Sequence, residues 1–267
     1  MLKIALCVKQ VPDTSDIKWT EHNTIQREGV ESIINPFDVY ACEFALKIKS
    51  EIKDVHITAF TMGPSQAEDM LRKLMAVGCD EAVLISDKKF AGADTYATGL
   101  TLSRSIRTVL PDFDLIICGQ FAVDGDTAQT GPNIANFLDI PQVTYVKDFV
   151  AYEHKSLEVI KEVEDGVELV KVILPSVICV LQNDKEPERP LINGIKKAYS
   201  KQIRHCSMED IGLTPEKVGI KGSPTYVSKA FRNMPAHNAQ KFTMNIDDSV
   251  NLLRDKLQSL GVIDNGK

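Results

Sequence analysis

The sequence predicts an α/β fold, in which a doubly wound, mostly parallel five-stranded core sheet carries an added β-hairpin and an extended C-terminal arm. Three observations predict it. Short apolar runs alternate with helical patterns over the first 150 residues. Two further strand patterns flank Asp165-Gly166, a dipeptide favoured in tight hairpin turns. Residues 182–267 are more polar and contain many turn residues.

The core elements are predicted from local patterns. Short aliphatic or β-branched runs are typical of strands buried on both faces of a parallel sheet, and they lie at 3–8, 55–62, 81–86, 114–119 and 143–146. Capping residues and helical spacing of apolar residues predict the helices between them. These lie at 35–50, 64–78, 94–110 and 127–138, the first with Asn35 as N-cap and Pro36 in its first turn.

The second half of the chain has a different pattern. The hairpin is expected to use residues 157–163 and 167–173, and another strand follows at 176–181. We therefore expect an α/β domain with a hairpin extension over 1–181, and a separate tail over 182–267. Within the tail only residues 247–260 have a firm helical pattern. A segment with so little core of its own is expected to pack on a partner.

Composition limits the class of protein. The chain is 43% apolar and 25% charged with a formal charge of −6, which argues against general nucleic-acid binding. Its six cysteines form no C-x-x-C pair, so we expect buried, reduced thiols and no metal site. No apolar run approaches the ~20 residues that span a bilayer, and the N-terminus lacks a signal-peptide pattern. We therefore expect a protein without a membrane span, in the cytoplasm or an organelle matrix.

The stretch GQFAVDGDTAQTGP at 119–132 follows a buried strand, where open α/β sheets bind ligands. Gly125 and Gly131 would let a ligand approach closely, and Thr127 and Thr130 would add hydroxyl donors. Asp126 is expected to cap the next helix, with Gln129 reaching back to it. The amides at a helix start favour an anion, so the loop is predicted to hold a phosphate. The ends of the first two strands and the helix start at 35–38 should line the same crevice.

Other known sites are absent from the sequence. It has no Walker A motif, no G-x-G-x-x-G after a strand and no G-x-S-x-G elbow. Its five histidines are isolated, so no catalytic residue is predicted. An ATP-binding regulatory module would need a basic residue near the triphosphate, and 114–132 contains no Lys or Arg. The motifs that are usual in adenylylating enzymes are also absent from the sequence.

Many stretches resemble the beta subunit of electron transfer flavoproteins. They run in the order of that family at 7–14, 27–49, 61–64, 72–87, 90–98, 114–132, 140–145, 161–168 and 174–180. The resemblance implies a domain of the adenine-nucleotide-binding type, without chemistry of its own, that pairs with an alpha subunit carrying FAD. In that family the beta subunit binds AMP in the simple carriers and a second FAD in the electron-bifurcating forms, so the resemblance implies one of these two ligands here.

The resemblance also places the nucleotide contacts. With the strand-end residues Lys9 and Gly119 added, they fall on Cys7, Lys9, Asn35, Pro36, Phe37, Asp38, Met62, Gly119, Gln120, Phe121, Ala122, Val123, Asp124, Gly125, Asp126, Thr127, Ala128, Gln129, Thr130 and Gly131. The loop at 124–131, the stretch 92–103 and Asp38 are more similar to the bifurcating forms. In those forms NADH is the electron donor, and the acceptors are ferredoxin or flavodoxin and a partner dehydrogenase. The alternative is a non-bifurcating carrier with structural AMP.

A partner-recognition loop is implied at about 186–195. In the family this loop inserts a hydrophobic residue into a flavin-containing dehydrogenase, and Leu191 or Ile192 would fill that role here. The sequence has E-P-E-R-P where many relatives have E-P-R-Y-P, so the partner's identity stays open.

Overall fold

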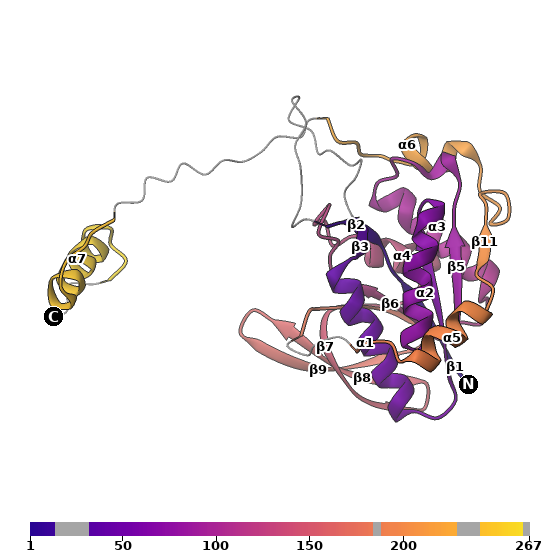
Figure 1. The fold of residues 1–267 in the computed structure, drawn as a ribbon, viewed down its shortest axis with the longest axis horizontal. Coiled ribbons are helices and arrows are strands. Elements are labelled where there is room, and N and C mark those ends of the chain that lie inside the picture. Colours follow the sequence, from indigo (N-terminus) through magenta and orange to yellow (C-terminus); the bar gives the residue numbers. More distant parts are fainter. Residues whose placement is uncertain (14–31, 184–187, 229–240, 264–267) are drawn as a thin grey trace. The chain divides into compact units, whose positions relative to one another are not determined.

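The computed structural model describes residues 1–13, 32–183, 188–228 and 241–263, and it contains two compact units. The first unit is Met1–Ala230 and the second is Phe231–Lys267. The first is built on a nine-stranded sheet with the order β11-β5-β4-β1-β6-β10-β7-β8-β9 (Figure 1). The strands are β1 (Leu2–Cys7), β4 (Val55–Met62), β5 (Glu81–Ile85), β6 (Leu115–Gly119), β7 (Gln142–Glu153), β8 (Ser156–Val163), β9 (Gly166–Ile173), β10 (Ser176–Val180) and β11 (Arg204–Cys206).

Helices cover both faces of the sheet, which confirms the doubly wound α/β prediction. The helices are α1 (Pro36–Glu51), α2 (Glu68–Val77), α3 (Thr95–Val109), α4 (Thr130–Leu138), α5 (Ile192–Ser200) and α6 (Gly219–Gly222). Buried residues of α1, α2 and α5 share one core cluster, and those of α3 and α4 share the cluster on the other face. Figure 1 shows α5 lying beside α2. No helix in the described part of the chain is long and apolar enough to cross a bilayer.

The predicted strands and helices are present, but two features of the sheet were not expected. β10 lies between β6 and β7 and pairs with both in parallel, although β7 precedes it in sequence. β7 was expected at 143–146 and runs to Glu153, because beyond its pairing with β10 it forms the first strand of an antiparallel meander with β8 and β9. The turn between β8 and β9 is at Asp165-Gly166 as predicted, with Gly166 at φ 149°.

The first unit extends beyond the boundary expected at 181. β11 pairs in parallel with β5, and α5 packs against α2, so the residues around them belong to the sheet domain. A small antiparallel pair, β2 (Gln10–Pro12) with β3 (Ser32–Ile34), leads from β1 towards α1. Short 3₁₀ turns lie at Ser65–Ala67, Lys88–Phe90 and Pro215–Lys217.

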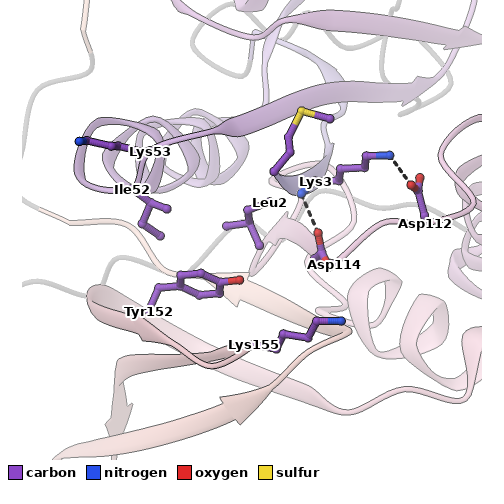
Figure 2. Close-up of a pocket in the computed structure, with 9 residues that line it drawn as sticks. Leu2, Lys3, Ile52, Lys53, Asp112, Asp114, Tyr152 and Lys155 are labelled. Carbon is purple, nitrogen blue, oxygen red and sulfur yellow. Dashed lines mark hydrogen bonds and ion pairs between the residues drawn. The ribbon is translucent and has the colours of Figure 1, made fainter.

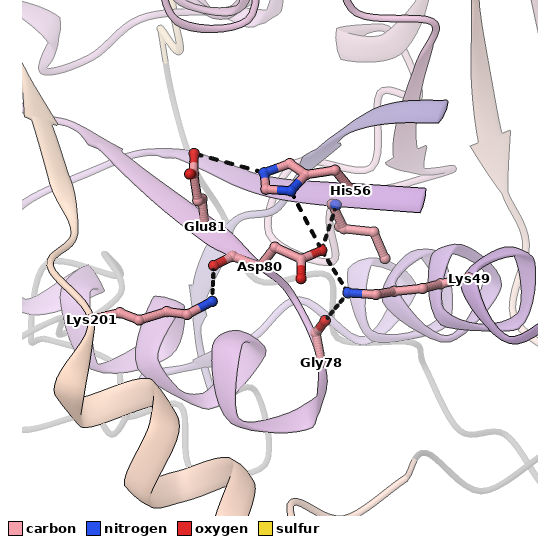
Figure 3. Close-up of polar contacts among 7 residues, drawn as sticks. Lys49, His56, Gly78, Asp80, Glu81 and Lys201 are labelled. Atoms are coloured by element: carbon pink, nitrogen blue, oxygen red, sulfur yellow. Dashed lines mark hydrogen bonds and ion pairs between the residues drawn. The ribbon is translucent and has the colours of Figure 1, made fainter. Parts of the chain in front are cut away.

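A charged cluster joins several elements at the amino-terminal edge of the strands (Figure 3). The Lys49 ammonium donates to the Asp80 carboxylate at 2.5 Å and to the Gly78 carbonyl at 3.0 Å. Burial alone would raise the pKa of Asp80, but hydrogen bonds from Lys49 and from the Ile57 amide lower it. Lys201 donates to the Asp80 carbonyl. The cluster therefore connects α1, β5 and the chain before β11 at the edge opposite to the predicted site.

In the second unit, α7 (Ile246–Ser259) is the predicted helix of the tail. Asn245 caps it, because its side-chain oxygen accepts from the Asp248 amide at 2.9 Å. The apolar side chains Ile246, Val250 and Leu253 are exposed on this helix. The helix is therefore amphipathic, and its packing on a partner stays a prediction.

Candidate functional site

Three neighbouring strands end together at the carboxyl edge of the sheet. Cys7 of β1 is opposite Cys118 of β6, which is in turn opposite Cys179 of β10. All three are buried free thiols in the core cluster beneath α3 and α4. A hydrogen bond with Cys7, together with burial, raises the pKa of Cys118, and burial raises that of Cys179. The three thiols are therefore part of the core packing, and the predicted ligand loop begins directly after Cys118, at Gly119.

Asn35, which precedes α1, binds the loop that follows β6 through two hydrogen bonds. Its side chain is fully buried, donates through Nδ2 to the Phe121 carbonyl at 2.7 Å and accepts from the Val123 amide at 3.1 Å. Asn35 does occupy the N-cap position of α1 with Pro36 following it, but its side chain makes no capping hydrogen bond. Its amide is used instead to fix the loop after β6, which is a contact between residues far apart in sequence.

Asp38 joins the same two segments to the end of β1. Its carboxylate accepts from the Lys9 amide at 2.6 Å and from the Gly119 amide at 3.2 Å. The side chain is buried, and burial raises its pKa to about 7. Gly119 lies so close that an added Cβ would be 2.3 Å from the Asp38 carboxylate and 2.7 Å from the Phe37 carbonyl carbon. Strand, helix start and loop thus meet at one buried carboxyl group.

The raised pKa of Asp38 predicts a pH-dependent stability. From its ordinary value of 3.8 up to about 7, the carboxyl ionises in the unfolded chain before it ionises in the folded one. The folded state then binds more protons, so this group's contribution to the free energy of unfolding falls as pH rises. The expected fall is about 1.4 kcal/mol per pH unit across that window. Urea unfolding of the wild type and of Asp38→Asn should give a stability difference that changes with pH; a constant difference would refute the assignment.

The loop carries its own charge compensation. The Lys9 ammonium forms an ion pair with both oxygens of Asp124, at 2.6 and 2.8 Å. Asp124 therefore neutralises the lysine nearest to the loop, and its own negative charge is offset. Any phosphate placed here would be met by backbone amides and hydroxyl groups instead of by this lysine.

The predicted capping box at Asp126 is wrong. α4 begins at Thr130, three residues later than expected, with Gln129 as N-cap residue and no side-chain cap. Asp126 and Ala128 both have left-handed backbones, with φ of 50° and 54°, so the chain makes a turn where a helix was expected. Gln129 accepts instead from the Thr95 hydroxyl at 3.0 Å, which ties the loop to α3. The Thr130 and Gly131 amides precede the first hydrogen bond of this helix start, which Asn133 donates to the Gln129 carbonyl, so they can donate to an anion.

The start of α4 packs closely on the cysteine row. An added Cβ on Gly131 would lie 2.3 Å from the Cys179 sulfur. Only a residue without a side chain lets the first turn of α4 lie this close to β10, and so places the helix start above the strand ends. Cys179 and Thr95 were not predicted as part of the site, since each becomes relevant only through a contact distant in sequence.

Comparisons with known proteins show the family of this chain. A sequence model of the electron transfer flavoprotein domain matches residues 22–210. The electron transfer flavoprotein subunit beta of Thermoanaerobacterium thermosaccharolyticum is 41% identical, over 98% of this chain and 100% of that protein. This chain belongs to the electron transfer flavoprotein beta-subunit family. It is also 45% identical to the caffeyl-CoA reductase-Etf complex subunit CarD of Acetobacterium woodii, over 86% and 87% of the two chains.

A further relative links the family to a reductase by name. The acryloyl-CoA reductase electron transfer subunit gamma of Anaerotignum propionicum is 42% identical, over 86% of this chain and 88% of its own. Membership of the electron transfer flavoprotein family makes this chain an electron-transfer protein.

The structure brings most of the predicted nucleotide contacts of this electron transfer flavoprotein subunit together. Lys9, Asn35, Phe37 and Asp38 all contact the loop or the strand end before it. Met62 ends β4 at the same edge and is half-buried. The Cys7 thiol is buried in the core cluster. Leu191 and Ile192 lie elsewhere, at the start of α5.

A cavity also lies at the opposite, amino-terminal edge of the sheet (Figure 2). It has a volume of about 460 Å³, and its lining includes Leu2, Asp114, Tyr152 and Lys155. The candidate site is the one at the carboxyl edge, because ligands of open α/β sheets bind beyond the carboxyl ends of the strands. Within the loop there, residues 124–127 and 129 are exposed.

Proposed function

We propose that this chain is the beta subunit of a heterodimeric electron transfer flavoprotein and holds FAD on the loop at 119–131. In the proposed complex it takes electrons from NADH, and the heterodimer divides them between ferredoxin or flavodoxin and a partner dehydrogenase. The observation that carries the proposal is the cradle at the carboxyl edge, where Asn35 and Asp38 fix the loop from beneath. At the two ends of the loop, Gly119 and Gly131 lie so close to their neighbours that a side chain would not fit.

The residues of the cradle fit an adenine dinucleotide. The first amides of α4 and the hydroxyls of Thr127 and Thr130 would bind the phosphates. The Lys9–Asp124 pair would hold the loop without adding net charge. When bound, FAD supplies the redox chemistry, while the chain supplies position and electrostatics. No described side chain has the arrangement of an acid–base or nucleophilic catalyst, so the chain is proposed as an electron-transfer subunit of an NADH-linked complex.

Structural AMP is the alternative occupant of this site. Both ligands have an adenosine and a phosphate, so the same cradle suits either of them. The resemblance of the loop, the stretch 92–103 and Asp38 to the bifurcating forms favours FAD. Chromatography of the nucleotides released from the denatured heterodimer distinguishes them. Two FAD support the proposal, whereas one FAD with one AMP would make the chain part of a simple carrier.

The dehydrogenase is proposed to dock on an apolar patch of α5. We define the α5 patch as Leu191, Ile192, Ile195 and Tyr199, which are 78%, 73%, 40% and 70% exposed. The helix packs so closely on α2 that a Cβ on Gly194 would lie 2.2 Å from the Ala76 carbonyl oxygen. Exposed charges at 188–189 and 196–197 surround the patch. An apolar centre inside a charged rim is the arrangement that concentrates binding energy in small interfaces.

Replacing Ile192 with Asp should weaken coupling to the dehydrogenase. A hot-spot residue contributes about 2 kcal/mol, so we expect a loss of roughly thirtyfold in affinity for the acceptor. Electron transfer should be measured against acceptor concentration, with flavin content recorded on the same sample. Ile192→Leu keeps an apolar side chain and should couple normally. Equal loss of flavin and coupling in Ile192→Asp would indicate a folding role for this residue.

A further inference from the structure

β7 carries a bulge at the carboxyl edge of the sheet, beside the ligand loop. Val143 pairs with Ile178 and Val146 pairs with Val180, so three steps on β7 match two on β10. Both valines face the same core cluster. Thr144 and Tyr145 lie between them, opposite a single residue of β10, so the bulge adds one residue to β7. Bulges of this kind are frequent near functional sites, because they redirect a side chain.

Tyr145 has an unfavourable backbone for its residue type. Its φ is 60°, in the left-handed region that glycine adopts freely and that bulky residues rarely adopt. A buried side chain maintains this conformation, since the Tyr145 amide donates to Gln120 Oε1 at 2.7 Å and Gln120 is only 3% exposed. A glycine would form the same bulge without strain. The tyrosine ring is therefore expected to make a functional interaction that offsets the free-energy cost of this backbone conformation.

The ring of Tyr145 belongs to an aromatic cluster that includes the loop. It meets Phe121 edge-to-face with centroids 6.3 Å apart, and Phe121 meets Phe37 in the same way at 5.2 Å. Phe121 is itself held by Asn35 through its carbonyl. Tyr145 is nevertheless 42% exposed, so its ring presents an open surface beside the proposed nucleotide cradle.

We propose that Tyr145 is a further ligand-binding residue, and that its ring packs against a planar heteroaromatic ring of the nucleotide bound on the loop. The inference rests on the proposed function, because it requires a nucleotide there. Flavin and adenine are both flat aromatic rings that pack favourably on tyrosine. Gln120 acts as a positioning residue, since it is only 3% exposed and its side-chain oxygen accepts from the Tyr145 amide.

Three variants distinguish the effect of the Tyr145 ring on binding from an effect on folding. Tyr145→Gly and Tyr145→Asn both remove the ring and both tolerate a left-handed backbone, so neither adds backbone strain, and the melting temperature of each is measured to record the loss of the Phe121 contact. Tyr145→Phe keeps the ring and removes only the hydroxyl. The heterodimer, freed of the nucleotide of this chain, is titrated with FAD and separately with AMP for each variant.

We expect Gly and Asn variants to bind nucleotide at least about tenfold more weakly, with Phe close to wild type. A loss for FAD alone supports contact with the flavin ring, and an equal loss for FAD and AMP supports contact with adenine. Unchanged affinity in the Gly and Asn variants would overturn the role of Tyr145 while leaving the proposed function in place. If the wild type bound neither nucleotide, the proposed function would fail as well.

Discussion

A Gly119→Ala variant is expected to lose its nucleotide and much of its stability. The new methyl group would lie 2.3 Å from the Asp38 carboxylate, 2.7 Å from the Phe37 carbonyl carbon and 2.9 Å from the Asp38 amide nitrogen. Two of these atoms are backbone at the start of α1, so no side-chain rotation relieves the overlap. Moving α1 away would break the Lys9 and Gly119 hydrogen bonds to Asp38. We expect a cost of about 3 kcal/mol.

Gly125 supplies the matched control for folding. It lies in the same loop and an added Cβ would meet nothing within 4 Å. Gly125→Ala should therefore unfold at the wild-type urea concentration, while Gly119→Ala unfolds earlier and retains less nucleotide after gel filtration. If the two variants were equally stable, the close contact between the end of β6 and the start of α1 would be absent from the protein.

A Gly131→Ala variant is expected to be destabilised by overlap with the side chain of Cys179. Its Cβ would overlap the Cys179 sulfur at 2.3 Å, while the Cys118 Cβ and sulfur lie at ordinary distances of 3.7 and 3.8 Å. Relief requires the start of α4 to move off the sheet, which would displace the amides proposed to bind phosphate. We expect a cost of about 2 kcal/mol, together with weaker nucleotide retention.

Removing the sulfur should reverse much of this effect. Cys179→Ala alone should cost about 1 kcal/mol, because it leaves a small void in the core. In the double variant the two changes compensate in volume, so the costs should be less than additive by about 1–2 kcal/mol. Nucleotide retention should recover with stability. Additive costs would show that α4 does not rest on Cys179.

The sequence predicted the parts of the fold that local patterns determine. Buried strands such as 55–62 are short runs rich in apolar and β-branched residues, and Asp165-Gly166 has the chemistry of a hairpin turn, so both were found. The position of β10 between β6 and β7 could not be predicted, because strand order depends on packing between distant segments. The exact length of β7 was missed for a related reason, since its second half pairs only with the meander.

Side-chain roles in the site were harder to predict than its location. The capping box at Asp126 was locally reasonable, but the Thr95 hydroxyl competes for Gln129 and the backbone at Asp126 is left-handed. Asn35 was read as a helix cap, while its amide holds a loop that follows a different strand. The pairing of Cys118 with Cys179 depends on strand register, which single runs of sequence do not contain.

The most direct measurement of the central claim is the number of adenine nucleotides carried by the purified heterodimer. The chain should be co-expressed with its alpha subunit without oxygen, denatured, and its FAD and AMP quantified against protein. In the proposed heterodimer the alpha subunit would carry one FAD, so we expect a second nucleotide on this chain, and we propose that it is FAD. A heterodimer with a single FAD and no other nucleotide would contradict it, and would leave the loop at 119–131 without a ligand.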